Sequence, residues 1–139
     1  MKPVSLSLSI LLAARGSAHF IVQYPESIGY SDIEEGTPPC GGFDITKRDP
    51  LIEFSVRGLS IALLSTHPES LWEFRAYLLN DTDHALYLVP PIRQTGYGSF
   101  CLPQLLGPAD WVGEEGVVQI SQKATDGQLF QVRRLMFVS

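Results

Sequence analysis

Hydrophobic and polar residues alternate along most of the chain after residue 18. The clearest case is the segment LWEFRAYLL at residues 71–79. One face of this segment would carry the apolar side chains Trp72, Phe74, Ala76 and Leu78, and the other face Glu73, Arg75 and Tyr77. A period of two residues is typical of a half-buried β-strand, since successive side chains point to opposite faces of a sheet. We therefore predict a strand here.

Similar patterns predict strands at residues 19–24, 51–56, 59–64, 72–79, 85–88, 98–102, 116–122 and 128–137. Residues 27–43 carry an acidic cluster, two adjacent prolines and a pair of adjacent glycines, which predict a loop. Asp126-Gly127 separates two apolar runs and predicts a hairpin turn. Seven or eight short strands in one chain predict an all-β fold, an immunoglobulin or fibronectin III-like β-sandwich. A small closed barrel is the alternative.

The first eighteen residues differ from the rest of the chain. Lys2 precedes an apolar run at residues 4–14, and Gly16-Ser17-Ala18 supplies small residues before a cleavage point. This order is typical of a secretory signal peptide, and the run is too short to span a bilayer. A packed N-terminal strand or helix is the alternative. Cleavage after Ala18 would secrete the protein and make His19 its first residue.

The composition limits the kind of protein further. The chain has 139 residues, of which 45% are hydrophobic, as expected for one globular domain with a core. A net charge of -5 provides no basic surface for phosphates, so we expect no nucleic-acid partner. We expect a monomer.

Two further features fit an extracellular protein. Cys40 and Cys101 would form at most one disulfide bridge, contributing about 3–5 kcal/mol by chain entropy, but the sequence does not show whether they meet. Asn80-Asp81-Thr82 is a glycosylation sequon near the end of a predicted strand.

The candidate chemistry lies in the three histidines, because no nucleophile elbow, P-loop, paired zinc cysteines or dinucleotide fingerprint is present. As an N-terminal residue, His19 would offer an α-amine and an imidazole to one metal ion. A second imidazole would complete a planar set of three nitrogens, which suits Cu(II). His67, in the turn Ser65-Thr66-His67-Pro68, is the candidate. As a lone histidine it would otherwise be a solvent-facing loop residue, as we expect for His84.

Several motifs together resemble the fungal copper-acquisition proteins, which are secreted histidine-brace proteins similar to lytic polysaccharide monooxygenases. The resemblance spans residues 19 to about 131 and depends on the order and spacing of its pieces. These are His19-Phe20, Pro25, Gly29, PCGGF at 39–43, Thr66-His67-Pro68, GYGSFC at 96–101, WVG at 111–113, GVVQI at 116–120 and DGQLFQ at 126–131.

The resemblance implies a sandwich that binds one copper ion. It implies the amine and imidazole of His19 as ligands, the imidazole of His67 as another, and a nearby carboxylate where the oxidative enzymes place a tyrosine. It also implies copper uptake or handling at the cell surface, with a cell-surface copper transporter as a possible partner, and not polysaccharide cleavage. Many members carry a serine-rich tail with a lipid-anchor signal, and residues 1–139 contain no such segment.

The chain departs from the family near its end. Where the family has Cys-Ala-Asp, this chain has Val132, Arg133 and Arg134, so the expected carboxylate and a disulfide partner are replaced. An arginine stays protonated and would repel a metal ion. Val-Arg-Arg-Leu can be encoded by GTG CGC CGA CTN, and reading one base later gives TGC GCC GAC, which encodes Cys-Ala-Asp. We hypothesise a frameshift or missed splice site near residue 131 of the 19–139 domain. Sequencing the transcript tests this, and an in-frame message ending at Ser139 would refute it.

Three functions are compatible with these features. The first is non-catalytic copper capture or transfer, which we favour. The second is an oxidative polysaccharide-cleaving copper enzyme, which would need a flat aromatic face, for which Tyr30, Tyr97 and Trp111 are candidates. The third is an extracellular interaction module that binds no copper.

Overall fold

The computed structural model describes residues 19–47 and 50–139. Within these residues the chain forms eight β-strands and one short 3-10 helix, η1 (Ala109–Trp111). None of its described helical segments has the length and apolar character needed to cross a bilayer. The predicted signal peptide, residues 1–18, lies outside the described residues.

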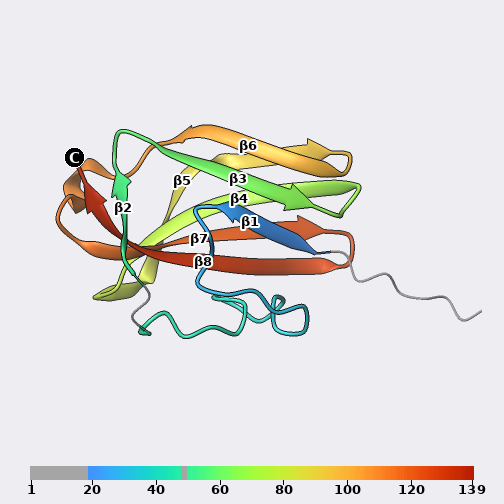
Figure 1. The fold of residues 1–139 in the computed structure, drawn as a ribbon, viewed down its shortest axis with the longest axis horizontal. Helices are drawn as coiled ribbons and strands as arrows, with labels where there is room; N and C mark the ends of the chain where they lie inside the picture. Colours follow the sequence, from blue (N-terminus) through green and yellow to red (C-terminus); the bar gives the residue numbers. More distant parts are fainter. Residues whose placement is uncertain (1–18, 48–49) are drawn as a thin grey trace, which may run out of the picture.

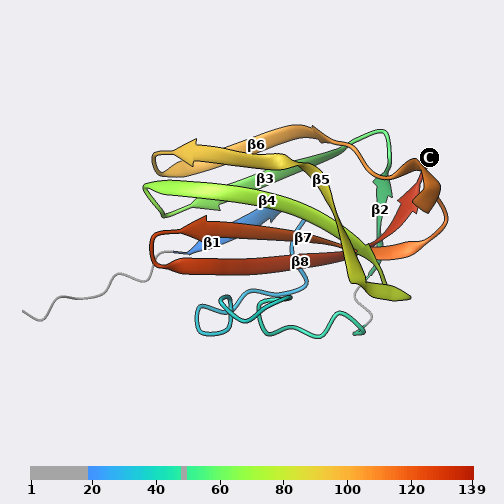
Figure 2. The same cartoon turned by 180° about the vertical axis from the view of Figure 1, so that it is seen from behind.

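The strands form two sheets that face each other (Figures 1 and 2). The three-stranded sheet has the order β1 (Phe20–Tyr24), β3 (Leu59–Ser65) and β6 (Gly98–Leu105). The five-stranded sheet has the order β2 (Ile52–Ser55), β8 (Gly127–Val138), β7 (Glu115–Ala124), β4 (Glu69–Leu78) and β5 (Asp81–Thr95). All pairings are antiparallel except that of β2 with β8. The predicted all-β sandwich is confirmed, and a closed barrel is excluded.

The core fills the space between the two sheets. Phe20 and Leu63 from the smaller sheet, and Trp72, Phe74 and Phe137 from the larger one, are almost completely buried. The rings of Phe20 and Trp72 meet edge to face at 5.2 Å, so β1 packs directly against the opposite sheet. Burying each side chain of this size contributes about 1.5–3 kcal/mol to folding.

Strand β5 is much longer than the predicted strand at 85–88. Pro90-Pro91 interrupts its hydrophobic pattern and argues against a central strand, because proline has no N–H for the ladder. In the structure β5 is the outermost strand of its sheet, so only one side of its backbone needs partners. An edge strand tolerates these prolines, and they also discourage pairing with another chain.

The expectation of a half-buried strand at 71–79 was wrong, because both of its faces are covered. Tyr77 is buried on the outer face beneath Cys40 of the predicted loop, in a small apolar cluster with Val117 and Val132. Glu73 is buried as well, and burial alone would raise the pKa of its carboxyl. Hydrogen bonds from Lys123 and Ser121 and the charge of nearby Arg75 outweigh burial, so this pKa is lowered.

Cys40 and Cys101 do not form a bridge, and both thiols are free. Cys40 is buried on the outer face of the five-stranded sheet, where its sulfur lies 3.5 Å from the hydroxyl of Tyr77. Cys101 is exposed on β6 of the other sheet. Packed sheets lie about 10 Å apart, whereas a disulfide needs Cα atoms within about 7 Å. Val132, the position at which the resemblance leads us to expect a cysteine, belongs to the same apolar cluster as Cys40.

We predict that Val132→Cys forms a disulfide with Cys40 under oxidising conditions. The loop containing Cys40 runs along β8 here, since Ile28 N–H donates to the carbonyl of Val132 at 2.9 Å. Closing a loop of 132 − 40 = 92 residues adds about 4–5 kcal/mol to the unfolding free energy. Thiol titration of the oxidised, denatured variant should find one free cysteine.

The double variant Cys40→Ser, Val132→Cys is the control, and it should retain two titratable thiols. Three free thiols in the single variant would show that the side chains at 40 and 132 do not reach each other.

Candidate metal centre

The beginning of β1 lies at the same end of the sandwich as three connections between strands. These are the β3–β4 turn with His67, the β5–β6 hairpin with Tyr97, and the β7–β8 hairpin with Asp126 (Figures 1 and 2). We call this the histidine end. The antiparallel order of the strands brings these four segments together although they are far apart in sequence.

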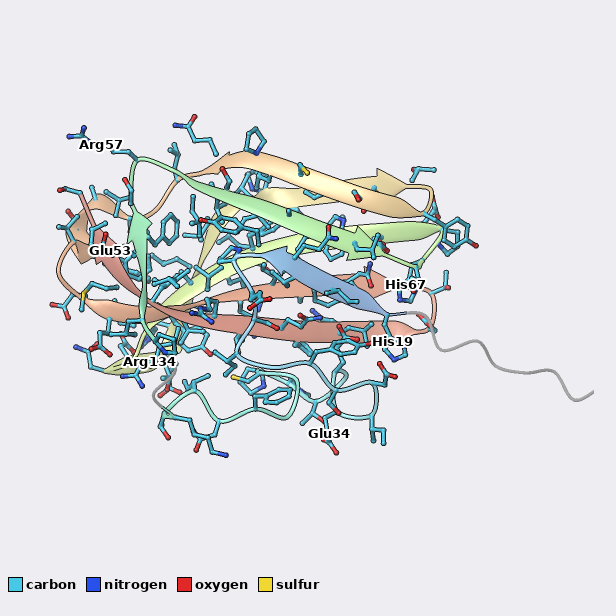
Figure 3. The ribbon with its side chains drawn as sticks, viewed as in Figure 1. His19, Glu34, Glu53, Arg57, His67 and Arg134 are labelled. Carbon is cyan, nitrogen blue, oxygen red and sulfur yellow. The ribbon has the colours of Figure 1, made fainter. Side chains whose placement is uncertain are left out.

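Pairing of β1 with β3 places His19 beside the turn that carries His67. In the ladder Phe20 is opposite Ser65. One residue beyond, the backbone N–H of Thr66 donates to the carbonyl of His19 at 3.1 Å. The hydroxyl of Thr66 donates to the same carbonyl at 2.9 Å and accepts from the backbone nitrogen of His19 at 2.8 Å. Figure 3 shows both histidines at this end of the sandwich.

The ring of His67 is held in one orientation. The residue is 2% exposed, and its Nδ1 lies 3.4 Å from Oδ1 of Asp126. Its backbone N–H donates to the hydroxyl of Ser65 at 3.1 Å. The second ring nitrogen, Nε2, is buried and has no hydrogen-bond partner among the described residues. A buried nitrogen without a partner is costly, and a carboxylate on the opposite ring nitrogen is the usual support of a metal-binding histidine.

In His19, unlike His67, the ring nitrogen that lies close to an aspartate is Nε2. Its Nε2 lies 3.2 Å from the backbone carbonyl of Asp32 and 3.9 Å from the Oδ1 of the same residue. With a proton on Nε2 donated to this carbonyl, the lone pair is on Nδ1, the ring nitrogen closer to the residue's own backbone nitrogen. Tyr30 packs edge to face on the ring at 6.2 Å and donates its hydroxyl proton to Asp32.

The two histidine side chains need a third ligand, from the backbone, to form a copper site. Among residues 19–47 and 50–139, no three side chains of the His, Cys, Asp and Glu types converge on a point that would hold a metal ion. A third nitrogen is present in the backbone nitrogen of His19, which becomes a metal-binding amine if the chain is cleaved after Ala18. Two imidazoles and an amine form the donor set that favours Cu(II).

Glu35, in the same loop as Tyr30 and Asp32, is 1% exposed. Its Oε1 accepts a hydrogen bond from Gln131 at 2.7 Å, whereas its Oε2 has no partner in the described part of the chain. Burial raises the pKa of this carboxyl to about 7, although the hydrogen bond from Gln131 and the charge of His19 oppose the shift. The carboxyl therefore keeps its proton well above the pH at which an exposed glutamate loses it.

Comparison with known proteins places the chain in a family. The family model for the copper acquisition factor BIM1-like domain matches residues 17–139. The chain belongs to the BIM1-like copper acquisition factor family. It is 34% identical to "Lytic polysaccharide monooxygenase-like protein X325" of Yarrowia lipolytica, over 94% of this chain and 52% of that protein. It is 33% identical to an uncharacterized protein of Aspergillus fumigatus, over 80% of this chain and 43% of that protein.

Membership of the BIM1-like family supports a copper-related function with copper as the ligand. The chain spans about half the length of the curated relatives it matches. The name of the Yarrowia relative leaves an enzymatic activity open.

The expectation that a family carboxylate would reach the metal from position 134 was wrong for this fold. Figure 3 shows Arg134 far from His19 and His67, toward the opposite end of the sandwich. Arg134 forms an ion pair with Glu115 and donates to the carbonyl of Thr46 at 3.2 Å. Along a strand, the eight positions from 126 to 134 cover roughly 26 Å, because each residue advances about 3.3 Å. Arg134 therefore does not repel a metal at the two histidines.

The structure gives the last segment an ordinary place in the sandwich. Leu135 and Phe137 are fully buried in the core, and β8 pairs with β7 as far as Met136. The frameshift hypothesis stays a prediction for the transcript.

The sequence reasoning did not identify the carboxylates that do lie near the histidines. Asp126 was assigned only to a hairpin turn and Asp32 only to an acidic loop. The predicted hairpin is present, but its two turn residues are Thr125-Asp126, one position earlier than the predicted Asp126-Gly127, because Gly127 already pairs with Ala124. The position of Asp126 could have been inferred from strand order. If β4 and β7 are antiparallel neighbours, the β7–β8 hairpin lies at the same end of the sheet as the β3–β4 turn.

Other candidate residues divide between the two ends. His84 is exposed beside Asp81, which raises the pKa of its ring by a 2.7 Å hydrogen bond. Tyr97 is 72% exposed at the histidine end, where Gly96 N–H donates to the carbonyl of Pro68. Trp111 instead packs edge to face on Phe137 at 5.3 Å. The three aromatic residues considered for a flat binding face therefore do not form one.

We predict that Glu35 makes the copper-free protein less stable as pH rises from about 4.5 to about 7. The unfolded carboxyl ionises near its ordinary value of 4.5, whereas the folded one keeps its proton to about 7. Over this window the unfolded state releases more protons, so the unfolding free energy falls. Denaturation of the wild type and Glu35→Gln from pH 4.5 to 7.5 should show a smaller fall in the variant.

Glu34→Gln is the matched control, because Glu34 is next to Glu35 in sequence but its carboxyl is exposed. This variant should keep the wild-type pH dependence of stability. An equal pH dependence in Glu35→Gln and wild type would contradict the assignment.

Proposed function

We propose that the mature protein begins at His19 and binds one Cu(II) ion for copper acquisition or handling outside the cell. The ligands are the α-amine and Nδ1 of His19 and Nε2 of His67. The observation that carries this proposal is the buried, unpartnered Nε2 of His67 in the turn whose Thr66 contacts the backbone nitrogen of His19. Family membership supports copper as the ion.

The arrangement of ring protons supports the same ligand atoms. Asp32 accepts at Nε2 of His19, and Asp126 lies at Nδ1 of His67, so each imidazole directs a different nitrogen toward the metal. The amine and Nδ1 of His19 belong to one residue and close a chelate ring around the ion. Because covalent bonds already hold these two ligand atoms close together, binding the ion loses less conformational entropy than it would with ligands from separate residues.

A non-catalytic role is the one we propose. Two carboxylates, those of Asp32 and Asp126, lie within 4 Å of the imidazoles, at 3.9 Å and 3.4 Å. Negative groups near the ion stabilise Cu(II) electrostatically and hinder its reduction, which oxygen activation requires. Trp111 packs against Phe137 and is not part of a flat face for a polysaccharide.

Secretion belongs to the same proposal, because only removal of residues 1–18 converts the His19 nitrogen into an amine. Asn80 is exposed in the turn between β4 and β5, and its sequon would be glycosylated on the secretory route. We further propose a monomer that passes copper to a cell-surface transporter.

The protein with an authentic His19 terminus should bind Cu(II) tightly at one ion per chain. A protein with one extra N-terminal residue should bind at least about tenfold more weakly, a loss of about 1.4 kcal/mol, since its His19 nitrogen is a peptide nitrogen. Competitive titration with a copper chelator measures both. Equal affinities would contradict ligation by the amine.

Replacing His67 by Ala should lower the Cu(II) affinity at least about tenfold, because it removes one of three nitrogens. Asp126→Asn should have a smaller effect, since the amide can still accept from Nδ1–H but carries no charge. His84→Ala is the control and should bind like the wild type, because this ring is exposed beside Asp81. Full affinity in His67→Ala would rule out His67 as a ligand.

A further inference from the structure

Two glutamines are buried in the interior of the sandwich near the histidine end. Gln122 lies on β7 and Gln131 on the adjacent strand β8. In the ladders Gln122 is opposite Trp72, and Gln131 is opposite Ile120, which is itself opposite Phe74. Both glutamines therefore share the inner face of the sheet with these core residues. Their exposed fractions are 0% and 2%.

Gln131 joins β8 to β1 across the space between the sheets. Its Nε2 donates to the carbonyl of Phe20 at 2.6 Å, and its Oε1 accepts from the N–H of Val22 at 3.3 Å. The same Nε2 donates to Glu35, whose backbone carbonyl accepts from the N–H of Phe130 at 2.8 Å. One side chain thus connects the strand that begins next to His19 with the loop that contacts the His19 ring.

Gln122 makes the corresponding connection to the turn of His67. Its Nε2 donates to the hydroxyls of Ser65 and Ser70, at 2.7 Å and 2.8 Å. These two serines lie on either side of the turn, and the Ser65 oxygen also accepts from the backbone N–H of His67 at 3.1 Å. Gln122 therefore closes the turn at its base and reaches the backbone of His67 through a single hydroxyl.

The cost of these side chains suggests a role beyond filling the core. The Oε1 of Gln122 is buried and has no hydrogen-bond partner among the described residues. Leaving such a group unpaired costs about 1–3 kcal/mol, whereas methionine has a similar volume and no such cost. Directional hydrogen bonds, however, fix the distance between two segments in a way that apolar packing does not.

We propose that Gln122 and Gln131 are positioning residues that hold the His67 turn and the His19 strand in the relative placement that copper needs. This inference rests on the proposed function, because it assumes that both histidines are ligands. The five-stranded sheet then acts as a common base to which each ligand segment is tied by one amide, so that little ordering remains when the metal binds.

Gln119 supplies a matched control. It lies on β7 like Gln122 but is opposite Arg75 and Val132, on the outer face of the sheet. Its Nε2 donates to the carbonyl of Pro39 at 2.7 Å, far from the histidine turn in sequence. Gln119→Met removes a part-buried amide hydrogen bond of the same type, and this bond ends on Pro39, neither in β1 nor in the turn of His67.

The first experiment uses the copper-free protein. Hydrogen exchange should become at least about fivefold faster at the Val22 amide in Gln131→Met, because this N–H loses its side-chain acceptor. The same increase is expected at the His67 amide in Gln122→Met, because its acceptor, the Ser65 hydroxyl, loses the hydrogen bond from Gln122. Gln119→Met should leave both amides at wild-type rates. Wild-type rates in the two interior variants would overturn the proposal.

The second experiment adds Cu(II) to the protein with an authentic His19 terminus. Both interior variants should bind at least about fivefold more weakly, and the parallel hyperfine splitting of Cu(II) in the electron paramagnetic resonance spectrum should change. Gln119→Met should match the wild type in both. Unchanged affinity and spectrum in the interior variants would overturn the positioning role while leaving wild-type copper binding intact.

The two failures are distinguishable. If the wild type binds no Cu(II), the proposed function fails. The exchange rates would still show whether the hydrogen bonds of Gln122 and Gln131 hold the two segments in place. If a methionine variant does not fold, Ser65→Ala removes only the hydroxyl between Gln122 and the His67 backbone. It should weaken Cu(II) binding at least about threefold, and full affinity would overturn the proposal for His67.

Discussion

Hydrogen bonds between His19 and Thr66 join β1 to the end of β3, and the rest of the histidine end depends on them. They continue the antiparallel ladder one residue past Phe20 and Ser65. A shift by one residue would turn Phe20 out of the core and move the His19 ring to the other side of the strand. The burial of Phe20 against Trp72 therefore sets the register that places His19 beside Thr66 in the turn of His67.

The polar groups around this end are arranged on both sides of the larger sheet. Inside, Gln122 and Gln131 extend from β7 and β8 to the segments of His67 and His19. Outside, Glu73 is surrounded by Lys123, Ser121 and Arg75, which satisfy its buried charge. The sheet thus combines an apolar core with polar contacts to the segments that carry both histidines.

The predicted loop at 27–43 has a structural role that its composition did not suggest. It covers the outer face of the five-stranded sheet, where Cys40 packs with Tyr77 and Val132. It also brings Tyr30 and Asp32 to the ring of His19. One irregular segment therefore replaces a layer of secondary structure and supplies contacts to a proposed ligand.

Local sequence patterns determined the strands, the β7–β8 hairpin and the all-β class, because alternation and turn propensity act between near neighbours. They did not predict the full length of β5, since tolerance for Pro90-Pro91 depends on its place at the sheet edge. The resemblance singled out His19 and His67, but it placed the carboxylate at position 134 and left the pairing of Cys40 open. Only the tertiary structure decided that Asp126 lies by His67, that Arg134 lies far away, and that Cys40 and Cys101 are separated by the sandwich. Those distances are set by strand order and by the packing of two sheets, which no segment of the chain contains by itself.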